Sequence, residues 1–152
     1  MRTPTLTASL IAAFLLGATC ARLVPVAGAA DAAAPAARIV DIGKMSDEEI
    51  GAARPGGTLR TQTLVAAPGA TVSIQSGDTP RHYHQGSDEI QYILEGSGTF
   101  WLGDTKREIG PGDLIIIPKG TNHGGTVATS GRFKALSIKT PPQAADDVHL
   151  VP

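Results

Sequence analysis

The stretch GDTPRHYHQGSDEIQYILEGSG, from Gly77 to Gly98, decides the fold of this chain. Two of the four histidines, His82 and His84, lie here one residue apart, and Glu89 follows the turn QGSD. Because side chains alternate between the two faces of a strand, both imidazoles point to one face. A hairpin at the turn can bring Glu89 back to them. Two imidazoles and a carboxylate form a ligand set that suits Zn, Fe, Mn, Ni or Cu.

A third imidazole ends the segment GDLIIIPKGTNH, at His123. The fully apolar run 114–117 predicts a buried strand, and Pro118 and Gly120 predict a turn before His123. Three of the four histidines therefore lie in two short segments. The fourth, His149, is in the C-terminal tail, and the sequence indicates no role for it.

The histidines and carboxylates allow several interpretations. The two neighbouring histidines can be an exposed pair on a strand, and Asp88 can be the ligand in place of Glu89. A closed zinc site uses four such ligands in a tetrahedron. Three imidazoles and one carboxylate in the mouth of a barrel favour an open geometry instead, in which an ion also binds water, dioxygen or a chelating substrate.

The rest of the chain predicts a β-protein. Short segments rich in Thr, Val and Ile are separated by turns containing Gly, Pro, Asp or Ser, which is typical of a sandwich or barrel. The predicted strands are 58–66, 70–77, 81–84, 89–96, 98–103, 106–110, 113–118, 123–128 and 133–140. Before them, Ser46 and Glu49 form a capping-box pattern that predicts one short helix, ended by Pro55–Gly57.

The first 30 residues predict a signal peptide. Arg2 precedes the apolar run LIAAFLLGATCA, and small residues around Ala29 and Ala30 suit cleavage there. The run is shorter than the roughly 18–20 residues that span a bilayer. We therefore predict an exported protein, periplasmic or secreted, with no stable membrane insertion after cleavage. A retained membrane anchor and a lipid-modified Cys20 are the alternatives, and the residues before Cys20 match a lipoprotein signal poorly.

Length and charge limit the number of domains and the classes of partner. The 152 residues predict one folded domain, divided into a signal peptide (1–30), a flexible leader (31–45), a barrel with its preceding helix (46–140) and a C-terminal tail (141–152). The tail is expected to lie along the outside of the barrel or along a partner chain. The formal net charge of −1, without runs of like charge, argues against nucleic acid as a partner.

The two histidine segments resemble the two motifs of the cupin superfamily. The first motif is matched by His82, His84, Glu89 and Gly96, and the second by Gly112, Pro118, Gly120 and His123. Val127 replaces the Asn that ends the second motif, a departure that leaves the ligand positions intact. The resemblance covers residues 58–140.

This resemblance implies an all-β fold, a single double-stranded β-helix (the cupin jelly-roll barrel), with the short N-terminal helix added. It implies one divalent transition metal (Fe, Mn, Zn, Ni or Cu) held by His82, His84, Glu89 and His123. It also implies a metal-dependent enzyme, either dioxygenase-like or an isomerase, decarboxylase or lyase, that acts on a small carbonyl or enol compound. The alternative is a non-catalytic module that binds or senses a small molecule.

The alternation of side chains along a strand predicts roles for further residues. If Glu89 faces inward, then Gln91 and Ile93 do so too, and with Phe100 they are the predicted lining of a substrate pocket. Gln91 is equally compatible with a hydrogen-bonded glutamine of the barrel wall. Glu89 is the predicted catalytic residue, as a proton acceptor that leaves the metal. The exposed edge strands of a jelly roll predict a homodimer.

Overall fold

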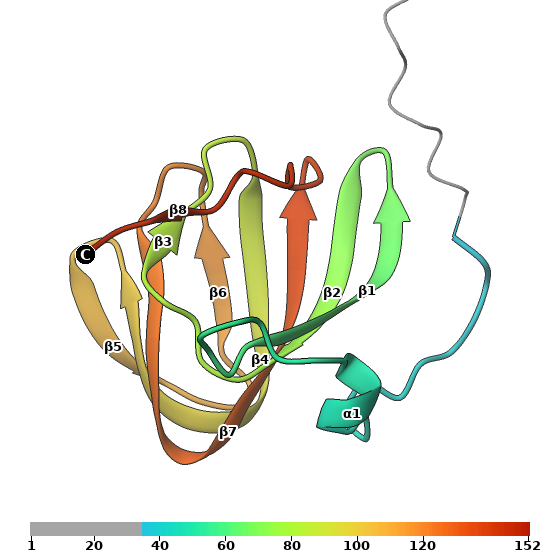
Figure 1. Ribbon diagram of the computed structural model, residues 1–152, viewed down its shortest axis with the longest axis horizontal. Coiled ribbons are helices and arrows are strands. Elements are labelled where there is room, and N and C mark those ends of the chain that lie inside the picture. The colour runs from blue at the N-terminus through green and yellow to red at the C-terminus, as the bar shows by residue number, and fades with distance from the viewer. Residues whose placement is uncertain (1–34) are drawn as a thin grey trace, which may run out of the picture.

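The structure, a computed structural model, describes residues 35–152 of the chain. Figure 1 shows strands that curl around a common interior, with one short helix outside them. The predicted signal peptide at 1–30 lies outside the described residues. None of the helices in residues 35–152 is long and apolar enough to cross a membrane.

Eight antiparallel strands form the barrel and confirm the predicted all-β fold. They are β1 (Arg60–Ala67), β2 (Ala70–Ser76), β3 (His82–Tyr83), β4 (Asp88–Leu102), β5 (Thr105–Ile109), β6 (Leu114–Ile117), β7 (His123–Thr140) and β8 (His149–Leu150). The main path of the sheet runs β1-β2-β7-β3-β8, and β4 pairs with β5, β6 and β7. The long pairing of β4 with β7 joins the two halves of the jelly roll.

Strands β4 and β7 are each continuous where the sequence predicts two separate segments. Glycines let these strands bend without breaking, and the register between them shifts several times from Ile93 to Trp101. Gly96 adopts a φ of 78°, and a Cβ on Gly98 would lie 2.1 Å from the carbonyl oxygen of Val127. Such close backbone approach requires glycine. The glycines therefore mark bends within strands, and not the ends of strands.

The apolar interior lies at the end of the barrel that includes β6 and the middle of β4. Its buried cluster comprises Ile93, Phe100, Ile115, Ile117, Phe133 and Ala135. The prediction of a buried strand at 114–117 is right for Ile115 and Ile117 and wrong for the other two residues. Leu114 and Ile116 are 61% and 64% exposed, because nothing within residues 35–152 covers the outer face of β6.

The predicted helix is present but shorter than expected. Helix α1 (Asp47–Ile50) begins at the N-cap Ser46, and the capping box with Glu49 is confirmed. It ends at Gly51, whose φ of 119° is closed to most other residues, and not at Pro55–Gly57. The chain after Gly51 forms a loop before β1, and residues 54–59 of this loop line a cavity of the barrel.

The C-terminal tail stays with its own barrel. Strand β8 pairs with β3, with His82 opposite Leu150 and Tyr83 opposite His149. The ring of His149 stacks on Tyr83 with 4.7 Å between centroids. Figure 1 shows β8 crossing the same end of the barrel as β3. The tail thereby lies next to the histidine motif.

Candidate metal centre

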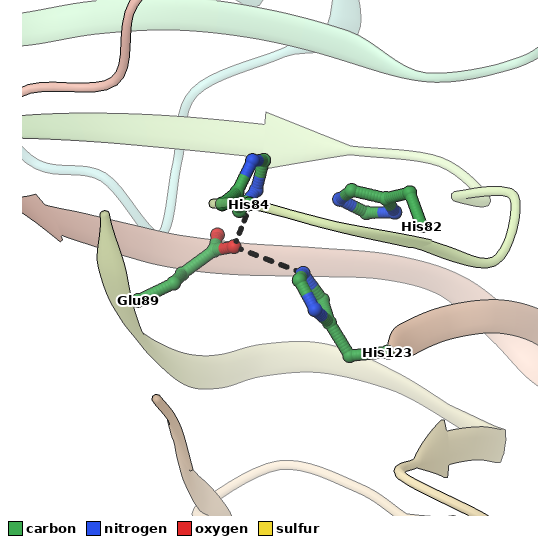
Figure 2. A group of neighbouring side chains, drawn as sticks. All are labelled: His82, His84, Glu89 and His123. Atoms are coloured by element: carbon green, nitrogen blue, oxygen red, sulfur yellow. Dashed lines mark hydrogen bonds and ion pairs between the residues drawn. The ribbon is translucent and has the colours of Figure 1, made fainter. Parts of the chain in front are cut away.

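The four predicted ligands converge inside the barrel. His82 lies on β3, His84 follows it, Glu89 lies near the start of β4, and His123 opens β7 opposite His82. One ligand atom from each residue lies within 4.8 Å of the others, and all four side chains are buried (Figure 2). Asp88, the alternative to Glu89, is exposed and accepts a hydrogen bond from the amide of Lys119. Of the two carboxylates, Glu89 therefore belongs to the cluster.

Each histidine of the cluster is oriented by a backbone carbonyl. The Nδ1 pairs are His82 with Pro80 at 2.9 Å, His84 with Asp147 at 2.5 Å, and His123 with Thr121 at 2.8 Å. A carbonyl oxygen only accepts hydrogen bonds, so Nδ1 carries the proton in each ring. In the neutral imidazole, Nε2 is then left with a free lone pair, as in most histidines that bind metals.

The Nε2 lone pairs of His84 and His123 point at another acceptor, the carboxylate of Glu89. Nε2 of His84 and Nε2 of His123 each lie 3.2 Å from Oε2 of Glu89 (Figure 2). Within residues 35–152, Nε2 of His84 has no hydrogen-bond partner. Buried acceptors that face one another without a proton to share are unfavourable unless a cation lies between them. The residues present therefore fit a metal ion.

The protonation states also suit a metal. Burial, and then the charge of His123, lower the pKa of His82 from 6.5 to about 4, so this ring is neutral near pH 7. Burial alone would raise the pKa of Glu89. The contacts of its carboxylate with His123 and His84, the charge of Lys139 and the hydrogen bond from Ser137 outweigh that effect and hold the pKa well below its ordinary value. Neutral imidazole and ionised carboxylate are the forms that coordinate metals.

The second carboxylate oxygen of Glu89, Oε1, accepts two hydrogen bonds and lies near one cation. Ser137 Oγ donates to Oε1 at 2.6 Å, Gln91 Nε2 donates at 3.0 Å, and Lys139 Nζ lies 3.6 Å away. Oε2 is left to face the histidines, so the contacts favour a ligand that binds through one oxygen. The predicted catalytic role of Glu89, which needs the carboxylate to move off the metal, stays a prediction.

A cavity of about 570 Å³ opens beside the histidines, within the usual range for small-molecule sites. The strands contribute His82, Glu89, Gln91 and Lys139, and His84 follows β3. The loop 54–59, residues 78–80 and the tail contribute further parts of the wall. Gln91, a predicted lining residue, is therefore at the cavity.

Ile93 and Phe100, the other two predicted lining residues, lie in the apolar cluster and not in the wall of this cavity. Ile93 is four residues beyond Glu89 along β4, and a strand rises about 3.3 Å per residue. It shares the inward face with Glu89 but lies far deeper in the barrel.

Three residues that support the cluster were not predicted. Ser137 and Lys139 lie on β7 and contact Glu89, and the alternation of the segment 133–140 was a signal that could have placed them on one face. Asp147 in the tail holds His84 with its carbonyl, and its carboxylate accepts hydrogen bonds from the amides of Gln85 and Gly86. No local pattern in the tail marks Asp147.

Comparison with known proteins places the chain in a family. The model of the Cupin domain family matches residues 63–139, which is half of the chain. The chain belongs to the cupin family. An RmlC-like cupin from Shewanella frigidimarina has a similar fold, with a TM-score of 0.52 and 17% identity over 62% of this chain and 85% of that one.

Two relatives match this cupin in part. It is 37% identical over 70 residues to uncharacterized protein MJ1618 of Methanocaldococcus jannaschii, which covers 46% of this chain and 56% of the relative. It is 41% identical over 59 residues to acireductone dioxygenase of Rhodopseudomonas palustris, which covers 36% of this chain and 35% of that enzyme. The cupin thus spans about half of the first relative and about a third of the second.

Proposed function

We propose that this cupin is a metal-dependent enzyme that acts on a small organic carbonyl or enol compound, with dioxygenase-like chemistry as the first class to test. The observation that carries the proposal is the convergence of four buried acceptor atoms with no proton to share. The partial likeness to an acireductone dioxygenase supports the choice of dioxygen chemistry over isomerase, decarboxylase or lyase chemistry.

In this proposal His82, His84 and His123 would hold one divalent ion through Nε2, and Glu89 would hold it through Oε2. When bound, such an ion can polarise a carbonyl or enol oxygen, or activate water or dioxygen. Other parts of the chain orient the ligands and admit the substrate. Ser137 keeps the carboxylate of Glu89 oriented, and the cavity walls admit a small molecule beside the histidines.

Metal content of the purified protein, measured by mass spectrometry, tests the site. We expect about one equivalent of Fe, Mn, Ni, Cu or Zn per chain in the wild type, and its loss in His82→Ala and Glu89→Gln. Asp88→Asn is the matched control, because Asp88 is adjacent but exposed and bonded elsewhere. A folded wild type that holds no metal and takes none up on titration would disprove the metal site.

Turnover is tested separately, by substrate-dependent oxygen consumption of the metal-loaded protein with a panel of small carbonyl and enediol compounds. Activity that disappears in His84→Ala supports the enzyme. If the loaded protein binds members of the panel without converting any, the non-catalytic binding module is the correct reading.

Export and homodimer formation are further parts of the proposal, supported by the sequence of residues 1–30 and by the edge strands of the barrel. The mass of the N-terminal peptide, after expression with the full chain, tests cleavage near Ala30. Light scattering tests the oligomeric state. An intact N-terminus in the mature protein would contradict export by this signal.

A further inference from the structure

A lysine lies inside the cavity, next to the proposed metal ligands. Lys139 on β7 is directly opposite Glu89 on β4, its side chain is 14% exposed, and it lines the cavity. Within residues 35–152, its one ion pair is the contact of Nζ with Oε1 of Glu89 at 3.6 Å, which is longer than a hydrogen bond. An ammonium group has three donors, so Lys139 has donors to offer a ligand.

Glu89 does not accept a hydrogen bond from the ammonium group of Lys139. Its Oε1 already accepts hydrogen bonds from Ser137 and Gln91, and its Oε2 faces the histidines. A buried cation without a close partner is unfavourable, and a bound anion would supply the missing partner. The cavity is the side from which an anion reaches Lys139 Nζ.

Lys139 is the buried cation of the cavity wall. Arg54 and Asp78 lie in the same wall but are exposed, and the charge of Arg54 acts on Lys139. With a divalent ion held by one carboxylate, the inner part of the cavity is net positive. A phosphate group is usually bound by helix N-termini or clusters of Arg, and neither lines this cavity. A carboxylate needs fewer donors.

We propose that Lys139 is a substrate-binding residue, and that the substrates are small organic acids whose carboxylate contacts Lys139 Nζ while another oxygen faces the metal centre. This inference rests on the proposed function and names its substrate class. It requires the metal and the anion to share one cavity, which is lined by His82, His84 and Lys139 together.

The test is calorimetric titration, at about pH 8.5, of the protein loaded with its native metal, using oxalate as the anionic probe and imidazole, which is neutral at that pH, as the uncharged one. In Lys139→Met we expect the Kd of oxalate to rise at least about tenfold, since hydrogen bonds to charged groups are strong. The Kd of imidazole should change by less than about twofold. Lys106→Met, which removes an exposed lysine from β5, should leave both values unchanged.

Metal content is measured on every variant, so that loss of metal is distinguished from loss of anion binding. Lys139→Gln, a polar replacement, provides a second variant if Lys139→Met does not fold, and should weaken oxalate to a similar extent. Equal changes for oxalate and imidazole, or no change for oxalate in a variant that keeps its metal, would overturn the inference. So would inorganic phosphate binding more tightly than oxalate in a manner that depends on Lys139. A wild type without metal overturns both this inference and the proposed function.

Discussion

The two ends of the barrel interior are built on the same strands but hold opposite chemistry. On β4, Glu89 and Gln91 belong to the polar end, while Ile93 and Phe100 belong to the apolar cluster. All four side chains are buried and belong to the barrel interior. The difference shows that one strand can supply both the core that stabilises the fold and the site that requires a ligand.

The two ends should respond differently to mutation and to metal. The apolar end is favourable by itself, because burying apolar surface needs no partner. The polar end gathers acceptors such as His84 Nε2 and Glu89 Oε2, which are unfavourable together without a cation. Substitutions in the apolar end should lower the free energy of unfolding with or without metal. Substitutions in the polar end should change the metal affinity and the dependence of stability on pH.

Phe133→Ala is expected to give the largest effect. Phe133 is 4% exposed in the apolar cluster, and its truncation should lower the free energy of unfolding by about 3–5 kcal/mol. Urea unfolding of the metal-free protein measures this loss. The molecules that stay folded should still bind one metal ion each. If Phe133→Ala removed the metal from folded protein, the two ends would not be independent.

Acidification should destabilise the metal-free protein through the polar end. The unfolded chain binds a proton on His82 near pH 6.5, whereas the folded chain does so only at about 4. The unfolded state therefore holds more protons between these values, and the free energy of unfolding falls as pH decreases through this window, by roughly 3 kcal/mol at most. Unfolding curves at several pH values measure the slope.

His82→Gln is the control for this prediction, since it removes the titrating ring and should flatten the curve between pH 6.5 and 4. Below pH 4.5, a further loss is expected, because the unfolded chain binds a proton on Glu89 there, whereas the folded chain, in which the pKa of Glu89 is lowered, does not. An identical slope in His82→Gln would assign the effect to another group.

Asp147→Ala should weaken metal binding through the tail. The carboxylate anchors the tail to Gln85 and Gly86, and the anchored carbonyl orients His84. Outer-shell changes of this kind cost about 10–100-fold in metal affinity, measurable by competition with a chelator. Asp146→Ala, one residue away and exposed, is the matched control and should bind metal normally. Equal affinities for the two variants would show that the tail does not support the site.

Ile116→Ala should have the smallest effect, and its neighbour sharpens the comparison. Ile116 is 64% exposed on β6, so its truncation should lower the free energy of unfolding by less than about 1 kcal/mol. Ile115 points into the apolar cluster at 7% exposure, and Ile115→Ala should cost about 2–5 kcal/mol. Chemical unfolding of dilute protein measures both. Similar losses would mean that the exposed face of β6 is covered in solution.

Local patterns in the sequence were enough for the fold class and for the residues of the cluster. The spacing of His82 and His84 places them on one face, and the capping box of Ser46 and Glu49 starts α1, because both effects act within a few residues. The burial of 114–117 could not be predicted, because an apolar run does not reveal whether a second layer covers both of its faces.

Only the tertiary structure decided what surrounds the cluster. Lys139 reaches Glu89 through the register of β4 with β7, and Asp147 reaches His84 because β8 pairs with β3. These contacts join residues about 50 and 63 positions apart. Sequence spacing sets which side chains share a strand face, but strand register and the path of the tail depend on the packing of the whole barrel. The ligand set was therefore readable from two short motifs, whereas its supporting partners depended on the closed fold.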